Sequence, residues 1–274
     1  MPSILSRTVA TLMLLAPGAA LAGSLEPVQP EPLPTVQAAP AQTPRLVFTL
    51  RGGVAVSPEY FGSSDYEIGP DLGFSLGYAR LGGFSFGSTD PNFEKRGLNL
   101  RGAFRYIPER SASKSPALAG LNDRDASVEL GLGLGYTQRN YEVFGDIRYG
   151  VVGHESFVGT LGADLRLHPT DRLTVTAGPR VSLGSDTFAN TYFGVTPAEA
   201  AASSFTAYEA QGGVMSAGVE LGATYRINDS WGVEGAATYE KLMGDAADSP
   251  ITQAGDDDQW RLRLGLTRRF SLGF

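Results

Sequence analysis

The chain has 274 residues with 35 glycines and no cysteine, and its formal net charge is -7. The length suits one large all-β unit, and the lack of cysteine excludes a disulfide framework, thiolate metal sites and lipid attachment through a cysteine. A net negative charge argues against nucleic acid as the partner.

The first 22 residues have the order of a secretory signal peptide. Arg7 supplies the positive start, Val9 to Ala16 form a short apolar run, and Ala20-Leu21-Ala22 is a small-x-small cleavage site. Residues 23–44 follow with six prolines, which prevent a helix or a strand ladder. We therefore expect an exported protein with a signal peptide over 1–22 and an extended periplasmic linker over 23–44.

From residue 46 onward, apolar side chains alternate with polar, small or charged ones. Alternation with a period of two indicates strands whose two faces meet different surroundings. We expect ten strands, at 46–56, 68–78, 97–106, 127–137, 141–150, 157–167, 172–183, 213–226, 231–242 and 260–274. A weak segment at 81–88 is a candidate further strand, and twelve strands result if the region 80–95 contributes two.

The last segment shows the alternation most clearly. Its even positions, from Trp260 through Leu264 to Phe274, are apolar except for Arg268, and its odd positions, such as Gly265, are small, polar or cationic. A tilted strand crosses a bilayer with about 9–11 residues, and aromatic residues mark the two interfaces. We therefore expect residues 45–274 to form a transmembrane antiparallel up-and-down β-barrel. A soluble periplasmic sandwich is the structural alternative.

The connections between these segments alternate in length. Short polar turns are expected at 138–140, 168–171 and 227–230, and long connections at 57–67, 108–126, 184–212 and 243–258. In outer-membrane barrels the short turns are periplasmic and the long loops are external. With an even number of strands, this pattern predicts that both chain ends lie in the periplasm.

The face that we assign to the lumen carries charges of both signs. Such a set forms either a salt-bridged, filled interior or a small selective pore. About eight strands leave an interior that side chains fill, and about sixteen leave an aqueous channel, so ten or twelve strands lie between these limits. The inward set comprises Arg51, Asp71, Arg101, Arg105, Glu129, Glu142, Asp146, Arg148, Asp164, Arg166, Arg172, Arg180, Glu220, Glu234, Glu240, Arg261 and Arg263.

Two loop features have a chemical interpretation. His154 and Ser156 resemble the His-x-Ser pair of outer-membrane lipid A deacylases, although a His and a Ser in a loop are more often just solvated. Five aspartates at 245, 248, 256, 257 and 258 do not have the spacing of an EF-hand loop. For them we expect a solvated acidic loop that shares divalent cations with lipopolysaccharide. We expect no specific metal site and no cofactor.

Four stretches give a family resemblance. The run from Ser57 to Tyr66 resembles the MipA/OmpV family of outer-membrane proteins, whose members carry P-x-Y-x-G-S-x-x-Y near the mature N-terminus. Residues 118–123 before 128–131, residues 192–196 and residues 244–251 resemble later stretches of the same family, in the same order. The signature residues are Pro58, Tyr60, Gly62, Ser63, Tyr66, Tyr192, Phe193, Gly194, Val195, Asp245, Asp248, Ser249 and Pro250.

The resemblance implies an outer-membrane barrel with no established enzymatic activity and no defined catalytic residues. The founding member is described as a scaffold that links a lytic murein transglycosylase to a penicillin-binding protein. We therefore expect a scaffold or binding protein that contacts lipid, lipopolysaccharide and such murein enzymes. The alternatives are a narrow solute pore and, with less support, an adhesin or a lipid A hydrolase.

Overall fold

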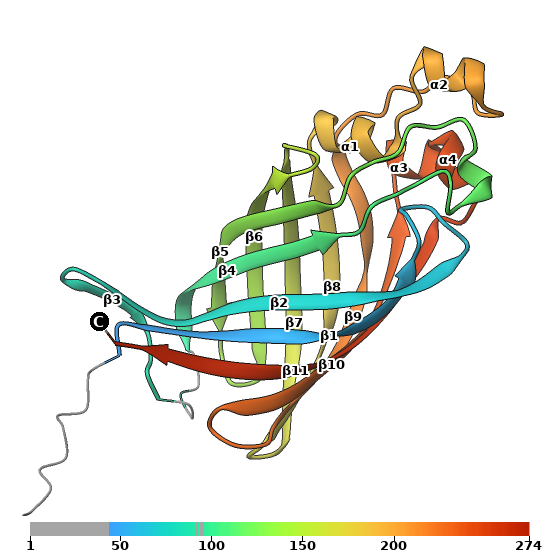
Figure 1. Ribbon diagram of the computed structural model, residues 1–274. Coiled ribbons are helices and arrows are strands. Elements are labelled where there is room, and N and C mark those ends of the chain that lie inside the picture. The colour runs from blue at the N-terminus through green and yellow to red at the C-terminus, as the bar shows by residue number, and fades with distance from the viewer. Residues whose placement is uncertain (1–43, 91–92, 94–95, 274) are drawn as a thin grey trace, which may run out of the picture. The chain divides into compact units, whose positions relative to one another are not determined.

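The computed structural model describes residues 44–90, 93 and 96–273 (Figure 1). The predicted signal peptide and residues 23–43 of the predicted linker lie outside this range. The described residues belong to one compact unit. None of the described helices is long and apolar enough to cross a membrane.

Eleven antiparallel strands form a single sheet that curls into a nearly closed barrel (Figure 1). The first strand pairs with the last, from Leu46 opposite Leu272 to Val56 opposite Leu262. The strand order is β3-β2-β1-β11-β10-β9-β8-β7-β6-β5-β4. The strands are β1 (Leu46–Pro58), β2 (Tyr66–Leu81), β3 (Phe84–Gly87), β4 (Gly97–Ile107), β5 (Ser127–Thr137), β6 (Tyr141–Val152), β7 (Phe157–Thr170), β8 (Leu173–Gly184), β9 (Gly213–Arg226), β10 (Trp231–Leu242) and β11 (Asp258–Leu272).

The predicted count of ten strands is wrong because of one short hairpin. The ten predicted segments correspond to the ten long strands, but β3 adds a four-residue strand that pairs with β2. Gly82, with φ of 60°, turns the chain back within two residues, a conformation that favours glycine. Four residues are too short to cross a bilayer, so β2 and β4 remain neighbours that run in opposite directions. The twelve-strand alternative is not formed by the described residues.

A seam separates β2 and β3 from β4, because the sheet order ends at these strands without a ladder between them. The strands still touch near the middle of the seam. A methyl group added to Gly102 of β4 would lie 3.0 Å from Cε1 of Phe74 of β2. Side-chain packing thus closes this part of the seam in place of backbone hydrogen bonds.

The barrel wall has an apolar outer face, as the alternation predicts. Leu262, Leu264 and Leu266 of β11 are more than half exposed in the isolated chain, which places them against lipid in a membrane. Arg268 interrupts this face without a register shift, and its guanidinium stacks 5.0 Å from the ring of Trp231 and 5.1 Å from that of Phe270. The aromatic rings therefore accommodate the cation, and no bulge is required.

The short turns and the long connections lie at opposite ends of the barrel (Figure 1). The short turns share their end with Leu46 and Leu272. At the other end the long connections fold into a layer that we call the cap, defined as residues 59–65, 108–126, 185–212 and 243–257. The cap contains a 3-10 helix (Pro116–Leu118) and the helices α1 (Asp186–Phe193), α2 (Pro197–Ala202), α3 (Asp245–Asp248) and α4 (Pro250–Gln253).

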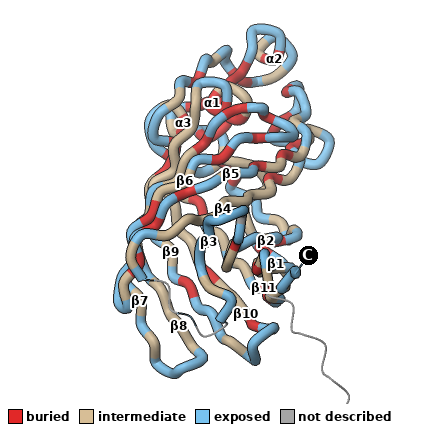
Figure 2. Tube along the Cα trace, turned by 90° about the vertical axis from the view of Figure 1, so that its left-hand side faces the viewer, coloured by how far each residue is buried: buried red, intermediate tan, exposed pale blue. Residues whose placement is uncertain are grey.

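Local chemistry explains the cap helices, which lie within the predicted long connections. Ser185 accepts a hydrogen bond from the backbone N–H of Phe188 and begins α1, and Thr196 and Glu199 form a capping box at the start of α2. Buried residues gather in the cap around α1 and on β5 and β6 near it (Figure 2). The protein therefore has a packed core at one end of the barrel.

Candidate functional site

The family-signature stretches, which are far apart in the sequence, meet in the cap. The ring of Phe61 lies 5.1 Å from that of Tyr192 and 5.9 Å from that of Phe193. Ser249 is fully buried, and its Oγ donates a 2.6 Å hydrogen bond to the carbonyl of Phe193. Aromatic packing and a buried hydrogen bond thus join three of the four stretches.

Gly62 occupies a position that only glycine fits. Its φ is 89°, and a methyl group there would lie 2.7 Å from Thr252 Oγ1 and 2.9 Å from the Thr252 Cα. Its N–H donates to Gln259 Oε1 at 3.2 Å, and its carbonyl accepts from the N–H of Asp256 at 2.9 Å. The first signature stretch is therefore tied to the connection between β10 and β11.

The other signature residues also support the cap. Tyr60 packs on the apolar cluster around Ile251, Ser63 is buried, and the Tyr66 hydroxyl accepts from the N–H of Trp260 at 3.2 Å.

Val195 pairs with Tyr208, whose hydroxyl donates to the carbonyl of Asp245 at 3.0 Å. Pro58 ends β1, Gly194 ends α1, Asp248 lies in α3 and Pro250 begins α4.

Charged side chains are buried at the base of α2. Glu199 accepts hydrogen bonds from the backbone N–H groups of Thr196 and Asn122, and it pairs with Arg124 at 3.1 Å. Burial alone would raise the pKa of Glu199, but these hydrogen bonds and the Arg124 charge outweigh it and lower the pKa to about 2. The carboxylate therefore stays charged and fixes the start of α2 to residues 122–124.

Arg110 is a buried cation above the barrel interior. Its Nη1 donates to the carbonyl of Tyr192 at 2.8 Å, while Nε and Nη2 have no hydrogen-bond partner. Burial, with the nearby Arg124 charge, lowers the pKa of Arg110 to about 10. Arg110 is not among the residues predicted to be functional. Nothing in the sequence around it indicates that this loop arginine is buried.

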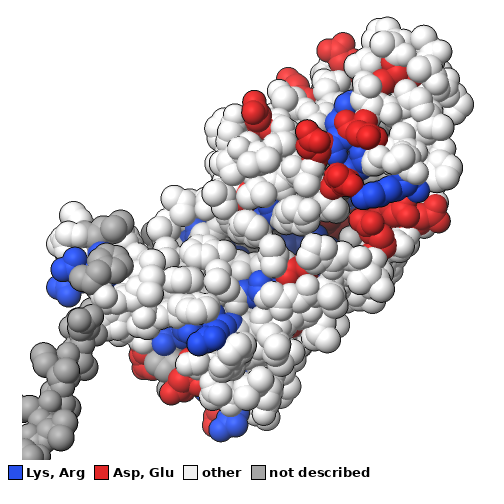
Figure 3. Space-filling view, viewed as in Figure 1, with Lys and Arg blue, Asp and Glu red and all other residues white. Residues whose placement is uncertain are grey.

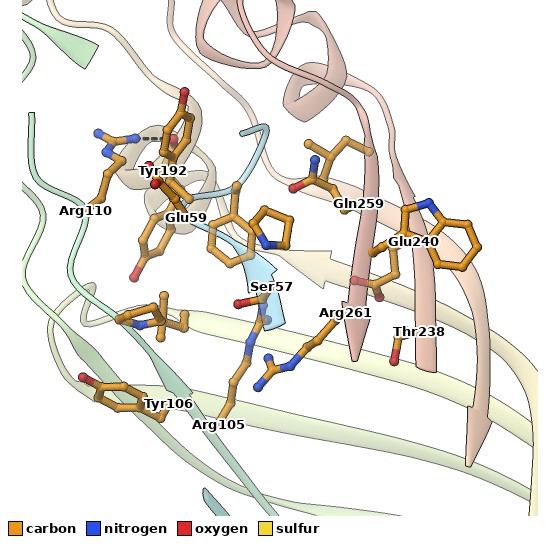
Figure 4. Close-up of a pocket in the computed structure, with 17 residues that line it drawn as sticks. Ser57, Glu59, Arg105, Tyr106, Arg110, Tyr192, Thr238, Glu240, Gln259 and Arg261 are labelled. Atoms are coloured by element: carbon orange, nitrogen blue, oxygen red, sulfur yellow. Dashed lines mark hydrogen bonds between the residues drawn. The ribbon is translucent and has the colours of Figure 1, made fainter. Parts of the chain in front are cut away.

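A cavity of about 120 Å³ lies beneath the cap (Figure 4). Its walls combine apolar groups from Pro58, Phe61, Ile107 and Leu242 with the side chains of Arg105 and Arg261. A second cavity of about 320 Å³ lies in the lumen and shares with it the lining residues Arg105, Tyr106, Thr238, Glu240 and Arg261. The capped apolar cavity therefore adjoins a polar lumen.

Ion pairs between neighbouring and next-neighbouring strands line the lumen, as expected for a salt-bridged interior. Asp71 pairs with Arg51 at 2.7 Å and with Arg261 at 3.0 Å, and Arg180 pairs with Asp164 at 2.9 Å and with Glu220 at 3.1 Å. Arg172 differs from the rest of the predicted inward set, since it lies exposed at the turn between β7 and β8. The further lumen pairs are Arg51–Glu234, Arg263–Glu234, Arg263–Glu220, Arg148–Glu129, Arg148–Asp146, Arg101–Glu142 and Arg166–Glu142.

His154 and Ser156 are buried, so the expectation that they are solvated is wrong. His154 Nδ1 lies 2.7 Å from Ser156 Oγ, and Nε2 lies 3.2 Å from Glu129 Oε1. The three groups have the order of a nucleophile, a base and an orienting carboxylate. Ser156, however, is only 4% exposed and lines neither cavity.

The neighbours of His154 explain this burial. The rings of Phe188 and Tyr192 stand edge-on to His154 at 5.2 and 5.8 Å, and Glu129 is also paired with Arg148. The cluster therefore connects α1 of the cap to β5 and β6 of the wall.

The acidic residues of the connection between β10 and β11 are partly neutralised. Carboxylate oxygens of Asp256, Asp257 and Asp258 lie within 4.8 Å of one another. Lys241 pairs with Asp257 at 2.9 Å and with Asp258 at 3.3 Å. Asp245 Oδ2 accepts from the N–H of Gln211 at 2.8 Å. These contacts join the acidic residues to Lys241 of β10 and to Gln211 of the cap.

Comparison with known proteins identifies relatives of this chain. Residues 50–270 match the family described as MltA-interacting protein MipA. The chain is 26% identical to outer membrane protein Omp26La of Vibrio anguillarum and 27% identical to outer membrane protein OmpV of Vibrio cholerae. Each match covers 78% of this chain and 85% of the relative. The MltA-interacting protein of Escherichia coli is 33% identical over 100 residues, which is 36% of this chain and 38% of that protein.

Two solved structures resemble the described fold more distantly. The translocator domain of the autotransporter NalP from Neisseria meningitidis matches with a TM-score of 0.39 and 12% identity, covering 84% of this chain and 90% of that one. The outer membrane protein OprG from Pseudomonas aeruginosa matches with a TM-score of 0.30 and 16% identity, covering 84% of this chain and 99% of that one.

Proposed function

The chain belongs to the MltA-interacting protein MipA family of outer-membrane proteins, and we propose that this β-barrel acts as a scaffold or binding protein. The observation that carries the proposal is the cap, whose core is packed from four separate stretches and tied by buried hydrogen bonds. Ordered loops on a rigid barrel are the usual place for recognition. The ion pairs that line the lumen support binding over bulk solute transport.

We propose murein enzymes as the protein partners, namely a lytic transglycosylase and a penicillin-binding protein. One relative, in Escherichia coli, is named MltA-interacting protein. Murein enzymes act in the periplasm, so the proposal assigns the end with the short turns and residues 23–44 to that side. The cap then faces the outside, so it supports binding among lipid and lipopolysaccharide, and contact with murein enzymes is assigned to the short-turn end and the linker.

Pull-down from an envelope extract tests the scaffold role. The full chain and a variant that lacks residues 23–44 are each used as bait, and bound murein enzymes are identified by mass spectrometry. We expect murein enzymes with the full chain and a weaker yield without the linker. If neither bait retains a murein enzyme, the scaffold role is wrong for this protein.

A narrow solute pore is the second candidate, and the lumen cavity of about 320 Å³ is the observation in its favour. Ion pairs lie around that cavity, and the cap core lies at one end of the barrel. In planar bilayers we therefore expect no conductance steps above the baseline at high salt. Regular steps from the refolded full chain would favour the pore over the scaffold.

A further inference from the structure

We propose that the cavity beneath the cap binds a small anionic amphiphile, with the anion held between Arg105 and Arg261 and a compact apolar body enclosed below the cap. This inference goes beyond the scaffold role and does not depend on it. No ligand of this kind follows from the family match.

The first argument is the electrostatic state of Arg105. Among the described residues, no carboxylate lies within ion-pair distance of Arg105, and its guanidinium stacks on the ring of Phe61 at 5.1 Å. Its cross-strand neighbour Glu129 is instead engaged by Arg148 at 2.8 Å and by His154 at 3.2 Å. Most other lumen arginines have a carboxylate partner. Arg105 therefore makes no direct ion pair, and its charge, which acts on Glu129 across the two strands, is also available to a further anion.

The second argument is the position of Arg261. The side chains of Arg105 and Arg261 come from opposite sides of the cavity and point toward each other (Figure 4). Coulomb repulsion acts between them, and Asp71, which pairs with Arg261 at 3.0 Å, is shared with Arg51. The Arg261 Nε is buried without a hydrogen-bond partner. Two converging guanidinium groups form the arrangement that recognises a carboxylate or a similar oxyanion.

The surroundings limit the charge of the ligand. Glu59 and Glu240 also line the cavity, so its three arginines, which include Arg110, are opposed by two carboxylates. Glu59 accepts from Ser115 Oγ at 2.5 Å, and Glu240 accepts from Ser182 Oγ at 3.3 Å. These five groups carry one net positive charge when all are ionised, and Asp71 beside Arg261 lowers the positive potential further. The cavity therefore suits a monoanion better than a dianion.

The apolar walls define the other part of the ligand. Phe61, Pro58, Ile107 and Leu242 border the same space as the two arginines, and the cavity measures about 120 Å³. An apolar cavity of about 150 Å³ in another protein binds benzene. One aromatic ring, or a short branched chain, is therefore the size that we expect beside the anion.

The lumen cavity reaches the seam, next to the part that Phe74 and Gly102 close. The lumen cavity is bordered by Pro70 and Leu72 of β2 and by Phe104 and Tyr106 of β4, the two strands that flank the seam. In the space-filling view, a few basic and acidic side chains are visible in the middle of the barrel wall, among uncharged ones (Figure 3). A ligand that partitions into the membrane can thus approach the arginines from the side, which favours an amphiphile over a freely soluble ion.

Titration followed by fluorine NMR tests the site with the folded full chain in detergent micelles. The probe is 4-fluorobenzoate and its neutral counterpart is 4-fluorobenzamide. Acetate, the anion without an apolar body, carries no fluorine and is measured by its displacement of 4-fluorobenzoate. We expect saturable binding of 4-fluorobenzoate, with 4-fluorobenzamide and acetate each at least about tenfold weaker. Arg105→Gln and Arg261→Gln should each weaken 4-fluorobenzoate by about tenfold, since each removes a charge-assisted contact.

Arg101→Gln is the matched control. Arg101 lies on β4 with Arg105 and is paired in the lumen, but it borders neither cavity. It should leave the affinity for 4-fluorobenzoate unchanged, and heat-modifiable gel migration confirms that each variant is folded. Equal binding of 4-fluorobenzamide, equal binding of acetate, or equal loss in all three variants would each overturn the proposal. Binding to empty micelles alone would do the same.

Discussion

The wall and the cap arrange apolar side chains in opposite ways. In the wall, apolar residues such as Leu264 face outward and ion pairs fill the inside, whereas in the cap Phe193, Leu118 and Ile251 are buried as in a soluble protein. The wall therefore depends on the membrane for its hydrophobic contribution to stability, and the cap carries its own core. The loss of stability caused by a substitution should therefore depend on lipid in the wall and not in the cap.

The largest effect is expected from Ile251→Ala in the cap. Ile251 is fully buried against Leu118, Val195 and Phe205, and truncation of such a side chain costs about 2–5 kcal/mol. Limited proteolysis within 243–258 should become faster in detergent and in vesicles alike, because lipid does not contribute to this core.

Met243→Ala is the control for the cap, since Met243 lies in the same connection but is exposed. Its effect should stay within about 0.5 kcal/mol. If Ile251→Ala also abolishes the heat-modifiable gel shift of the barrel, the cap and the wall are not separate in stability.

Leu264→Arg tests the wall and should cost about 2–4 kcal/mol in lipid vesicles, as for a cation near the bilayer midplane. Gly69→Ser, with open space around its Cα, should be nearly silent. Refolding stability in vesicles measures both. Equal destabilisation by the two changes would contradict the assignment of the faces.

Alternation alone suggests Gly265→Ser as the silent lumen change, and the structure corrects this choice. A methyl group on Gly265 would lie 2.9 Å from Arg51 Cγ and 3.0 Å from the carbonyl oxygen of Gly52. Gly265 faces the lumen side of β11, as expected, but the ion-paired Arg51 already fills the space. The alternation of the sequence predicts which face of the strand a residue lies on. It does not predict whether there is space for a larger side chain there.

Ser156→Ala tests the junction of wall and cap. The change removes the hydrogen bond to His154 Nδ1 at 2.7 Å and should cost about 1–3 kcal/mol, because a buried partner is left unsatisfied. Lipid A from cells that overexpress either form should have the same mass spectrum. Modified lipid A with the unchanged protein alone would assign the cluster a hydrolytic role.

Glu199→Gln should weaken the attachment of α2 at neutral pH, where the carboxylate is fully charged, and it should remove a pH dependence. The folded pKa of Glu199 is lowered to about 2, from 4.5, so its contribution is fully present above about pH 4.5 and is lost as the pH falls toward 2. Proteolysis of α2 by pepsin between pH 4.5 and 2 should accelerate less steeply in Glu199→Gln. An identical pH profile in both forms would show that Glu199 does not fix α2.

The sequence predicts the wall better than the cap for a physical reason. Alternation is local, so the ten long strands and the lipid face of Leu264 follow from neighbouring residues. The four-residue β3 has too few positions to show a period. The cap helices have at most eight residues, and their local signals are single N-cap residues such as Ser185 and the capping box at Thr196 and Glu199.

The candidate site was accessible to sequence reasoning only in part. The alternation placed Arg105 and Arg261 on the inward face, but their convergence depends on how the sheet curls. The signature residues were selected by resemblance, and their meeting around Phe61 depends on contacts between connections that are far apart in the chain. Burial of Arg110 and His154 likewise requires the folded cap.

The pairing of the first strand with the last has a consequence for the order of folding. Neighbouring hairpins such as β9–β10 need only short loops, whereas the β1–β11 ladder joins residues at the two extremes of the barrel sequence. The entropy of closing a loop rises with its length, and contacts between distant residues slow folding. The bond between Gly62 and Gln259 links the connection after β1 to β11 itself. We therefore expect the barrel to close only after β11 has formed, and the cap to fold last.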